Sequence, residues 1–500
     1  MSADGAILIT GATGFIGHYV LGELLRQGRR CVALVRDRPE RLQRLLQGAG
    51  APAPTDGRLL VAPGALPDRL PDLRRQGIRQ VVHLAANTRF DATASEPHRT
   101  NVEGMRRLLA WAEAHGVEGL TLVSTAYVCG LNEGPVPERI EPVLPRFRNA
   151  YEESKWHAEA LATRWEGASR RVAIVRPTVV TGAWDTGRAT EFRGFYLLAR
   201  SVEMLAQGLD TGADGRRTVP LRLPGRPEDA AQIVPVDFVA RAVAHAVTHA
   251  EARGVFHLAH PRPPSNAQMK AWLEEVFDIG GGEFAGDAAV AEAHSPAEAL
   301  FHSAAASLSA YFAHSPRFCM ERAAALLSEV GIACPPIDGA YVGRIIAYAQ
   351  RAAWGRGARR QRAASGDVGA YCAAYFERFL PEHLPRSSVS RLAPVRATIR
   401  FVIEDGPGEW VCQFAGGRVV QVGRGANQVR EDFGYRASGA GFWRAISGAV
   451  DGEQLFLGGE ADVFGDVERA LMMSAILREF TREFPCDRER LAPYLVPSCS

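Results

Sequence analysis

Short runs of consecutive apolar residues alternate with helical patterns through the first part of the chain. A strand that is covered on both faces shows such a run instead of an apolar–polar alternation. The runs predict buried strands at residues 6–10, 30–35, 58–62, 81–86, 120–125 and 171–176, and the patterns between them predict helices at 18–27, 95–115 and 151–166. Alternating strands and helices predict an α/β fold with a doubly wound parallel sheet, whose ligands bind at the carboxyl ends of the strands.

The pattern changes after about residue 366. Residues 368–379 predict an amphipathic helix, and the strands expected at 397–403, 409–414 and 418–422 are separated by short turns that contain glycine. This spacing predicts an antiparallel meander. Segments at 441–450, 453–464 and 466–480 complete an α+β pattern, and 341–350 predicts a helix that closes the first part. We therefore expect a separate α+β domain after the α/β domain.

The first predicted strand runs directly into a glycine-rich turn and then a helix. Gly11, Gly14 and Gly17 form the pattern Gly-x-x-Gly-x-x-Gly, a variant of the dinucleotide fingerprint in the strand–turn–helix context that it requires. Glycines permit a tight turn and close approach of a pyrophosphate, which then lies at the helix N-terminus. The predicted cofactor site also takes in the other residues of this turn: Thr13, Phe15 and Ile16.

The end of the second predicted strand bears on the choice of cofactor. It runs into Arg36, Asp37 and Arg38. A chain that binds NAD usually carries an acidic residue here for the ribose 2′-hydroxyl, whereas an arginine suits the 2′-phosphate of NADP. Arg36 therefore favours NADP (NADPH), and Asp37 leaves NAD open.

A lysine stands out in a chain that uses arginine almost everywhere. Only two lysines occur in 500 residues, and one is Lys155, four positions after Tyr151. On a helix this spacing places both side chains on one face. An ammonium can change the pKa of a nearby phenol at close range, in a way that a guanidinium does not reproduce. Ser124 and Thr125 add two hydroxyls at the end of the fifth predicted strand, and the four residues are candidates for catalysis.

Together these residues resemble the extended short-chain dehydrogenase/reductase superfamily, from residue 6 to about 350. The resemblance implies a Rossmann-type sheet with a small substrate lobe. It implies that Thr125, with Ser124 beside it, binds the substrate carbonyl, that Tyr151 transfers the proton, and that Lys155 holds the nicotinamide ribose and lowers the pKa of Tyr151. It also implies cofactor contacts from Ala85, Ala86, Asn101, Pro177, Val179 and Val180.

Within the superfamily the chain most resembles fatty acyl reductases and thioester reductase domains. The supporting runs are 85–90, 124–128 and 151–159. One departure stands at Gly64-Ala65-Leu66, where such reductases usually carry Gly-Asp-Leu, so that the Asp expected to contact the adenine is missing. Steroid dehydrogenases and sugar-nucleotide enzymes of the superfamily share most of these motifs.

The last part of the chain resembles the sterol-carrier-protein type-2 fold, through the runs 401–406, 408–410 and 461–466. In that family a curved sheet and helices enclose an apolar tunnel for lipids or acyl-CoA. We expect a reductase domain at 1–350, an arginine-rich linker at 351–365 and a lipid-binding domain at 366–500. The linker is either solvated or a contact for an anionic membrane surface or an acyl carrier.

Composition narrows the class of protein. The net charge of +2 predicts neither nucleic-acid nor membrane binding, and no apolar run is long enough to span a membrane. The eight cysteines show no Cys-x-x-Cys spacing, so we expect neither a metal site nor a disulfide framework. The chain enters its first strand without a basic, signal-like leader, and a cytoplasmic enzyme is expected.

Three functions are compatible with these features. The first is an NADPH-dependent reductase of a lipid-like acyl thioester, carried on CoA or an acyl carrier protein, with an aldehyde or alcohol as product. The second is an NAD(P)-dependent oxidoreductase of a sterol or other cyclic lipid. The third is a catalytically idle lipid-binding protein, against which the intact set of Thr125, Tyr151 and Lys155 argues. The identity of the lipid, the direction of the reaction and the oligomeric state are left open.

Overall fold

The computed structural model describes residues 5–36, 38–51, 56–88, 95–132, 134–207, 216–286, 298–299, 301–302, 311, 316–355, 368–392, 396–404, 408–425, 430–457 and 460–495. The chain forms two compact units, each assembled from three segments. The first unit comprises Met1–Glu191, Arg226–Lys270 and Ala310–Tyr348, and the second comprises Phe192–Gly225, Ala271–Ser309 and Ala349–Ser500. Most of the predicted linker lies outside the described residues, because these stop at 355 and resume at 368.

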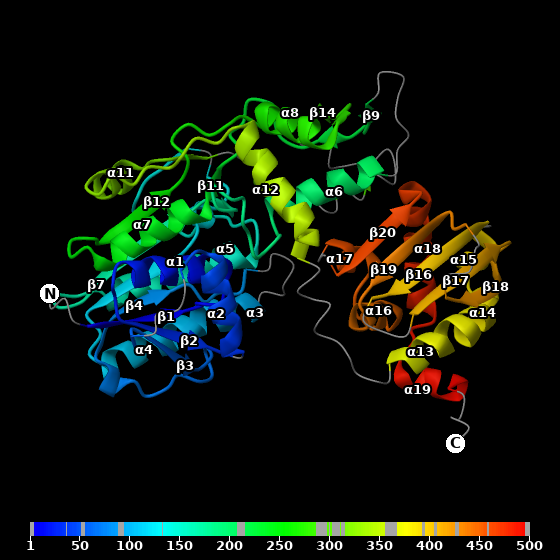
Figure 1. The fold of residues 1–500 in the computed structure, drawn as a ribbon, viewed down its shortest axis with the longest axis horizontal. Coiled ribbons are helices and arrows are strands. Elements are labelled where there is room, and N and C mark those ends of the chain that lie inside the picture. The colour runs from blue at the N-terminus through cyan, green and yellow to red at the C-terminus, as the bar shows by residue number, and fades with distance from the viewer. Residues whose placement is uncertain are drawn as a thin grey trace. The chain divides into compact units, whose positions relative to one another are not determined.

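The first unit is built on a parallel sheet of seven strands (Figure 1). In spatial order they are β12 (Gly254–Leu258), β7 (Arg171–Pro177), β5 (Gly119–Val123), β4 (Ile78–His83), β1 (Ala6–Thr10), β2 (Cys31–Val35) and β3 (Leu59–Pro63). Six of them overlap the predicted strands, which confirms the doubly wound α/β core. The seventh, β12, was not predicted, and it adds to the edge beside β7 in parallel register.

Helices cover both faces of this sheet, as its fully buried central strands require. On one face, α1 (Phe15–Arg26), α2 (Pro39–Gly48), α7 (Val236–Thr248) and α11 (Glu321–Ser328) share a hydrophobic core with the strands. On the other, α4 (Gly104–Ala114) and α5 (Ala150–Trp165) share a second core. Figure 1 shows α1 and α7 on one side of the strands and α4 on the other. The carboxyl ends of the strands thus face loops that lead into the helices.

Shorter elements complete the first unit. They are η1 (Arg74–Gln76), α3 (Ser95–Pro97), the π-helical turn η2 (His98–Glu103), η3 (Ala126–Cys129) and the strand pairs β6 (Pro135–Val136) with β15 (Arg317–Phe318) and β8 (Val179–Thr181) with β11 (Ile233–Pro235). Helix α12 (Gly339–Arg351) confirms the predicted closing helix. Its buried Tyr341 hydroxyl lies 2.7 Å from Thr181 Oγ1 and donates to the carbonyl of Gly182 at 2.8 Å, which connects α12 to the end of β8.

The second unit contains a mixed five-stranded sheet. In spatial order its strands are β18 (Arg418–Arg424), β17 (Gly408–Ala415), β16 (Ala397–Ile403), β19 (Phe433–Ala437) and β20 (Ala461–Gly465). The pairing of β16, β17 and β18 is antiparallel, which confirms the predicted meander. Strand β19 was not predicted, and it pairs in parallel with β16 and antiparallel with β20.

Helices pack against this sheet around an aromatic core. Phe376 lies at the centre of that core, with ring-centroid distances of 4.7 Å to Phe401, 5.2 Å to Trp410 and 5.0 Å to Phe442. Near the sheet the helices are α13 (Val368–Ala374), η6 (Tyr375–Phe379), α14 (Leu380–His383), η7 (Leu384–Arg386), α15 (Val389–Leu392), α16 (Gly439–Ile446), α17 (Gly452–Leu457), α18 (Val467–Glu483), α19 (Arg488–Leu491) and η8 (Ala492–Tyr494). The remaining elements are α6 (Phe195–Gln207), β9 (Arg217–Thr218), β10 (Arg222–Leu223), α8 (Asn266–Phe277), β13 (Ile279–Gly280), β14 (Glu283–Phe284) and η4 (Ala353–Gly355).

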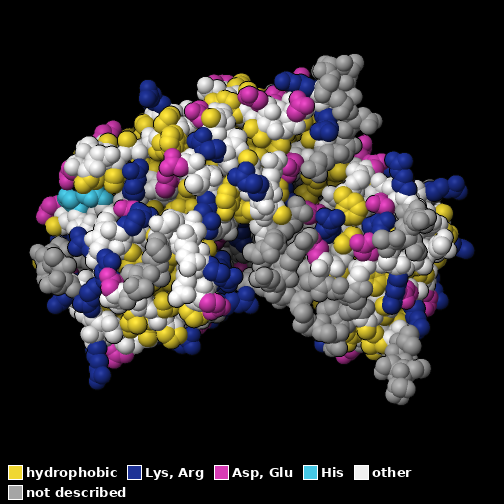
Figure 2. All heavy atoms as spheres, viewed as in Figure 1, with side chains coloured by type: hydrophobic (Ala, Val, Ile, Leu, Met, Phe, Trp, Pro, Cys, Tyr) yellow, Lys and Arg dark blue, Asp and Glu magenta, His cyan; other side chains and the backbone are white. Residues whose placement is uncertain are grey.

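The surface carries both signs of charge. Figure 2 shows basic and acidic side chains interspersed over the visible face, without a continuous basic field of the kind that binds nucleic acids. Among the described residues, no helix combines the length and the apolar character needed to cross a bilayer.

Candidate active site

The turn after β1 accepts only glycine at two of its positions. Gly11 has a φ of +73°, and a Cβ added there would lie 2.6 Å from the backbone nitrogen of Ala85. A Cβ at Gly17 would lie 2.0 Å from the carbonyl oxygen of Gly11. The backbone of Gly14, the N-cap of α1, donates to that same oxygen at 2.9 Å, and no side chain caps the helix. The free N–H groups of such a helix start are suited to a phosphate.

A hydrogen-bonded chain connects the ends of β1 and β4 beside this turn. Thr10 Oγ1 lies 2.7 Å from His83 Nδ1 and accepts from the backbone of Ala85 at 3.3 Å. Burial, and after it the charge of Lys155, lowers the pKa of His83 to about 3, so its ring is neutral. Ala85 is therefore held against the glycine turn, and Ala86 follows it in the loop that the resemblance places along the cofactor.

Lys155 lies inside the fold at the end of β5. The residue is 2% exposed, and its Nζ donates to the carbonyl of Val123 at 2.8 Å. Burial lowers the pKa of Lys155 to about 8, while the carboxylate of Glu159 acts in the opposite direction. The ammonium has three donors, of which this bond uses one.

Tyr151 and Thr125 are brought together from α5 and from the end of β5. Thr125 begins η3, where its Oγ1 accepts from the backbone of Tyr127 at 3.3 Å. Burial, followed by the charge of Glu152, raises the pKa of Tyr151, and a side-chain hydrogen bond with Thr125 opposes this. Because burial is the largest influence, the pKa of Tyr151 is raised in the structure. The resemblance had implied that Lys155 lowers it. The phenol is protonated at neutral pH.

Ser124 is the second hydroxyl of the predicted pair. It is 5% exposed, and its Oγ has no hydrogen-bond partner among the described residues. Its backbone nitrogen donates to the carbonyl of Val175 at 2.8 Å, which holds the strand end in place. A buried hydroxyl without a partner costs free energy, so this Oγ is available to a polar group that enters the site.

Asn101 connects the loop after β4 to helix α5. It is 1% exposed, and its side chain accepts from the backbone of Asn87 at 2.7 Å and donates to the carbonyl of Asn87 at 3.0 Å. Its Nδ2 also donates to Ser154 Oγ at 2.8 Å, and Ser154 donates to the carbonyl of Tyr151 at 2.8 Å. The side chain of Asn101 is thus engaged with the protein on all sides.

Four residues that the sequence analysis did not assign to the site hold the start of α5. Asn149 caps the helix by accepting from the backbone of Glu152 at 3.0 Å, and it donates to the hydroxyl of Tyr311 at 2.9 Å. Arg148 and Glu152 form a buried pair at 3.4 Å. The guanidinium of Arg148 lies 5.1 Å from the ring centroid of Tyr311. The cap was visible in the sequence as Asn before a helical pattern, but Tyr311 lies far along the chain and carries no motif.

A buried ion pair joins α5 to β7. Arg176 donates to both carboxylate oxygens of Glu159, at 3.0 and 2.6 Å. Just beyond Arg176, β7 ends at Pro177 and β8 starts at Val179, whose backbone donates to the carbonyl of Gln232 at 3.2 Å. Val180, paired with Val234 of β11, is half-buried like Val179. These residues lie at the strand end where the resemblance placed the nicotinamide.

The residues predicted to read the cofactor's ribose lie at the end of β2. Arg36 is exposed, and Arg38 adopts a φ of +55° at the N-cap of α2. Asp37 lies outside the described residues. Next to them, the backbone of Gly64 donates to the carbonyl of Val35 at 2.9 Å, and Ala65 follows where an Asp was expected.

The second unit contains a large cavity of about 740 Å³, within the size range of small-molecule sites. Its walls are mainly apolar and come from η6, the sheet and the helices α16 to α18; they include Tyr375, Phe401, Phe442, Ala445, Leu455 and Leu477. Leu471 and Leu477 of α18 both line it. This unit thus contains a mainly apolar cavity.

Comparison with known families identifies both parts. Residues 9–243 match the family described as male sterility protein, and residues 376–478 match the SCP-2 sterol transfer family. The chain joins a male sterility protein domain to an SCP-2 sterol transfer domain. This confirms the resemblance to reductases in the first part and to the sterol-carrier fold in the second. The first match is to a model of an NAD-binding domain, and the glycine turn around Gly11 fits a nicotinamide dinucleotide.

Curated relatives match the male sterility protein domain only in part of their length. A putative dihydroflavonol 4-reductase of Synechocystis is 31% identical over 182 residues, which cover 35% of this chain and 50% of the relative. The aldehyde reductase lnaA of Aspergillus flavus is 26% identical over 307 residues, which cover 56% of this chain and 28% of the relative. The chain thus spans half or less of the length of these relatives.

Two solved structures share the fold. The terminal R domain from the myxalamid PKS-NRPS biosynthetic pathway superposes with a TM-score of 0.58 at 23% identity, covering 71% of this chain and 92% of that chain. A thiolation-reductase di-domain from an archaeal non-ribosomal peptide synthetase gives a TM-score of 0.53 at 19% identity, covering 70% of this chain and 91% of that chain. At these identities the likeness concerns the fold.

Proposed function

We propose that the protein is an NADPH-dependent reductase of a lipid-like acyl thioester, and that its SCP-2 sterol transfer domain holds the acyl chain. The observation that carries the proposal is the combination, on one chain, of a Thr125–Tyr151–Lys155 set, in which Thr125 and Lys155 are buried and Tyr151 is half-buried, with an apolar cavity of about 740 Å³. The R domain and the thiolation-reductase di-domain that share the fold support a substrate bound as a thioester. A carrier such as CoA or an acyl carrier protein is part of the proposal.

The cofactor would be held by residues that the sequence singled out. The turn of Gly11, Thr13, Gly14, Phe15, Ile16 and Gly17 takes the pyrophosphate, because its backbone approaches closely and the start of α1 is uncapped. Arg36 takes the 2′-phosphate of NADPH. Ala85, Ala86, Pro177, Val179 and Val180 line the path of the nicotinamide, and Asn101 positions this loop through Asn87. When bound, the cofactor supplies a hydride.

Tyr151 is the proton donor in this proposal. Its raised pKa keeps the phenol protonated at neutral pH, which is the form needed to protonate a carbonyl oxygen during reduction. Thr125 Oγ1 accepts from the backbone of Tyr127 and shares a side-chain hydrogen bond with Tyr151, so both hydroxyls would meet the same carbonyl oxygen of the substrate. Ser124 Oγ, buried and unpartnered among the described residues, offers a further donor.

Lys155 assists the proton donor Tyr151 through its positive charge. One N–H of its ammonium is fixed on Val123, and the other two are free to bind the nicotinamide ribose and to stabilise negative charge that develops on the phenol. With a thioester substrate, addition of a hydride and a proton gives a hemithioacetal. The carbon–sulfur bond then breaks and releases an aldehyde and a thiol. Reduction of the aldehyde by a second hydride and proton would give the alcohol.

The proposal is tested by following NADPH oxidation against acyl-CoA, acyl-carrier-protein and sterol-ketone substrates, with product mass analysis and thiol titration. Turnover with stoichiometric release of thiol supports it. Turnover of a sterol without thiol release would instead establish the second candidate, an oxidoreductase of a cyclic lipid, which the match to the SCP-2 sterol transfer family favours. If no substrate is turned over, the third candidate, a catalytically idle lipid-binding protein, would be the remaining function.

The boundaries 1–350, 351–365 and 366–500 remain our proposal for the reductase domain, the linker and the lipid-binding domain. Both family matches fall inside the two larger parts. A cytoplasmic location is also proposed. It agrees with the seven cysteines of the described residues, which are all free thiols, as is usual in a reducing compartment.

A further inference from the structure

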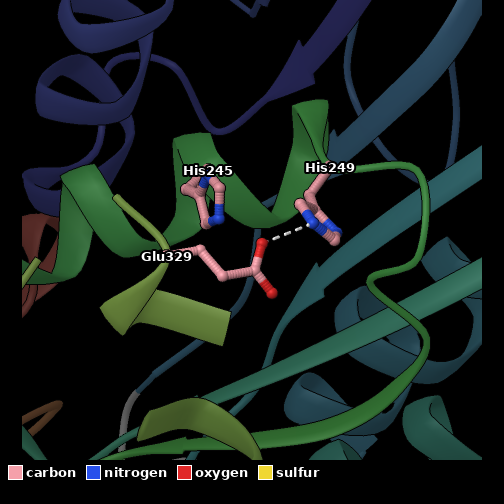
Figure 3. A group of neighbouring side chains, drawn as sticks. All are labelled: His245, His249 and Glu329. Atoms are coloured by element: carbon pink, nitrogen blue, oxygen red, sulfur yellow. Dashed lines mark hydrogen bonds and ion pairs between the residues drawn. The ribbon is translucent and has the colours of Figure 1, made fainter. Parts of the chain in front are cut away.

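Two histidines and a glutamate converge at the C-terminal end of α7. His245 lies in the last turn of the helix, His249 is its C-cap, and Glu329 is the C-cap of α11. Figure 3 shows the three side chains directed toward one another, the two imidazoles from α7 and the carboxylate from the end of α11. One ligand atom of each residue lies within 4.8 Å of the others. All three belong to the first unit.

We propose that His245, His249 and Glu329 form a site for a first-row divalent metal ion, with Zn²⁺ as the preferred probe. Residues four apart lie on one helix face, so both imidazoles can reach one ion. Two imidazole nitrogens and a carboxylate oxygen are a ligand set that zinc uses in proteins, with water in the remaining position. The sequence predicted no metal site because only the spacing of cysteines was considered. This cluster contains no cysteine.

The geometry requires only a small adjustment. Ligand atoms bound to one zinc ion at about 2.0–2.2 Å lie roughly 3.3–3.6 Å apart in a tetrahedral arrangement. His249 Nε2 and Glu329 Oε2 are 2.9 Å apart and must separate slightly to hold an ion between them, and the side chain of Glu329 is 54% exposed. A side-chain rotation of this exposed carboxylate therefore suffices to adjust the distances, and the open side admits solvent and ions.

The surroundings hold the rings in place. His245 Nε2 lies 3.1 Å from the carbonyl of Leu326 in α11, a contact of the kind that orients metal-binding histidines. An ion bound here would cross-link α7 to α11, and both helices share a core with the edge strand β12.

The test uses the purified full-length protein after treatment with EDTA. Calorimetric titration with Zn²⁺ is expected to show one saturable site per chain, and Zn²⁺ but not Mg²⁺ should raise the melting temperature, because a ligand that binds the native state stabilises it. His249→Asn and Glu329→Gln should each weaken Zn²⁺ binding at least about tenfold. Glu321→Gln, which removes an exposed carboxylate from the first turn of α11, is the matched control and should bind as the parent does.

The melting temperature of each variant is also measured without metal, so that loss of the His249–Glu329 contact itself is separated from loss of the ion. Absence of a saturable Zn²⁺ site in the parent would overturn the proposal. Equal Zn²⁺ affinity in the parent, His249→Asn and Glu329→Gln would also overturn it, since the ion would then bind elsewhere. Neither readout depends on oxidoreductase activity, so the result is independent of the proposed function.

Discussion

The Nδ2 of Asn101 donates a hydrogen bond of 2.8 Å to Ser154 Oγ and thereby connects the loop after β4 to the helix that carries Tyr151 and Lys155. The same amide holds the backbone of Asn87 through two further bonds. One buried side chain thus sets the position of the proposed cofactor loop relative to the proposed proton donor. Its role would be positioning, since its hydrogen-bonding groups are engaged with the protein.

Asn101→Ala is expected to destabilise the protein and to impair cofactor use. Removing the amide breaks two hydrogen bonds with the backbone of Asn87 and one with Ser154 Oγ, at a cost of about 1–3 kcal/mol. The melting temperature should fall, and the KM for NADPH should rise together with a lower kcat. Asn132→Ala, at an exposed turn position, is the control. Parent-like stability and KM for NADPH in Asn101→Ala would contradict the positioning role.

Tyr151→Phe should reduce turnover by about 10²-fold or more while NADPH binding is largely kept, because it removes the proton donor and retains the ring. Lys155→Arg should also be severely impaired, since a planar guanidinium cannot replace a compact ammonium in a buried site. Steady-state rates and fluorescence titration with NADPH measure the two effects. Tyr494→Phe, in the C-terminal domain, should retain parent activity. Near-normal turnover in Tyr151→Phe or Lys155→Arg would remove that residue from the mechanism.

Lys155 should give the protein a distinctive dependence on pH. Its pKa is about 8 in the fold, below its usual value of 10.5, so between these values the unfolded chain binds more protons than the native state. Stability therefore rises with pH across this window, by up to about 1.4 kcal/mol per pH unit from this group. Denaturant unfolding of the parent and of Lys155→Met from pH 7.5 to 10.5 measures the difference, and parallel curves would contradict it.

The same titration should appear in catalysis. If the Lys155 ammonium is required, kcat/KM, which reports groups of the free enzyme, should decline as the pH rises through about 8, where its pKa lies.

Arg36→Ala should weaken NADPH binding much more than NADH binding, because only NADPH carries the 2′-phosphate that an arginine recognises. Dissociation constants for both cofactors measure the preference. Arg44→Ala removes an exposed arginine of α2 and should leave it unchanged. Equal losses for NADPH and NADH in Arg36→Ala would show that Arg36 does not recognise the phosphate.

Filling the apolar cavity should affect long substrates selectively. An apolar chain gains roughly 0.8 kcal/mol per buried CH₂ before ordering costs, so affinity should rise with chain length in the parent. Ala445→Trp places a large ring in the cavity wall and should end this rise at shorter chains. Ala440→Trp, exposed on the same helix, is the control. Identical chain-length profiles for the parent and Ala445→Trp would argue against lipid binding in this cavity.

The sequence predicted those strands whose pattern is unambiguous. Strands β1, β5 and β7 are buried along their whole length, and such runs of apolar residues have few other interpretations. Strand β19 was missed because its alternating run, Phe433, Tyr435 and Ala437, is only five residues long and contains Gly434, and a glycine weakens a strand prediction. Strand β12 was missed because it follows a long Ala-rich stretch that carries no recognised motif. The positions of β19 and β12 are set by pairing with strands that are distant in the sequence. A local sequence pattern does not reveal such pairing.

The residues of the candidate site also fall into two groups, those that a sequence motif predicts and those that only the tertiary fold brings together. Gly11, Tyr151 and Lys155 belong to short motifs whose chemistry follows from their spacing. Tyr311 contacts Asn149 across 162 positions of the sequence, and only the tertiary fold reveals it. The His245–His249 spacing was visible in the sequence, but Glu329 was not connected to it until α11 was placed beside α7.

Strand β12 has a consequence for how the reductase half can be dissected and synthesised. It pairs with the fully buried β7 along Gly254–Leu258, yet the match to the male sterility protein family stops at residue 243. A fragment cut at that match would leave β7 as a bare apolar border with unpaired backbone groups, a surface prone to aggregation. On the ribosome the same border stays open until α7 and β12 have emerged, so the nascent chain passes through an aggregation-prone interval that a chaperone would be expected to shield.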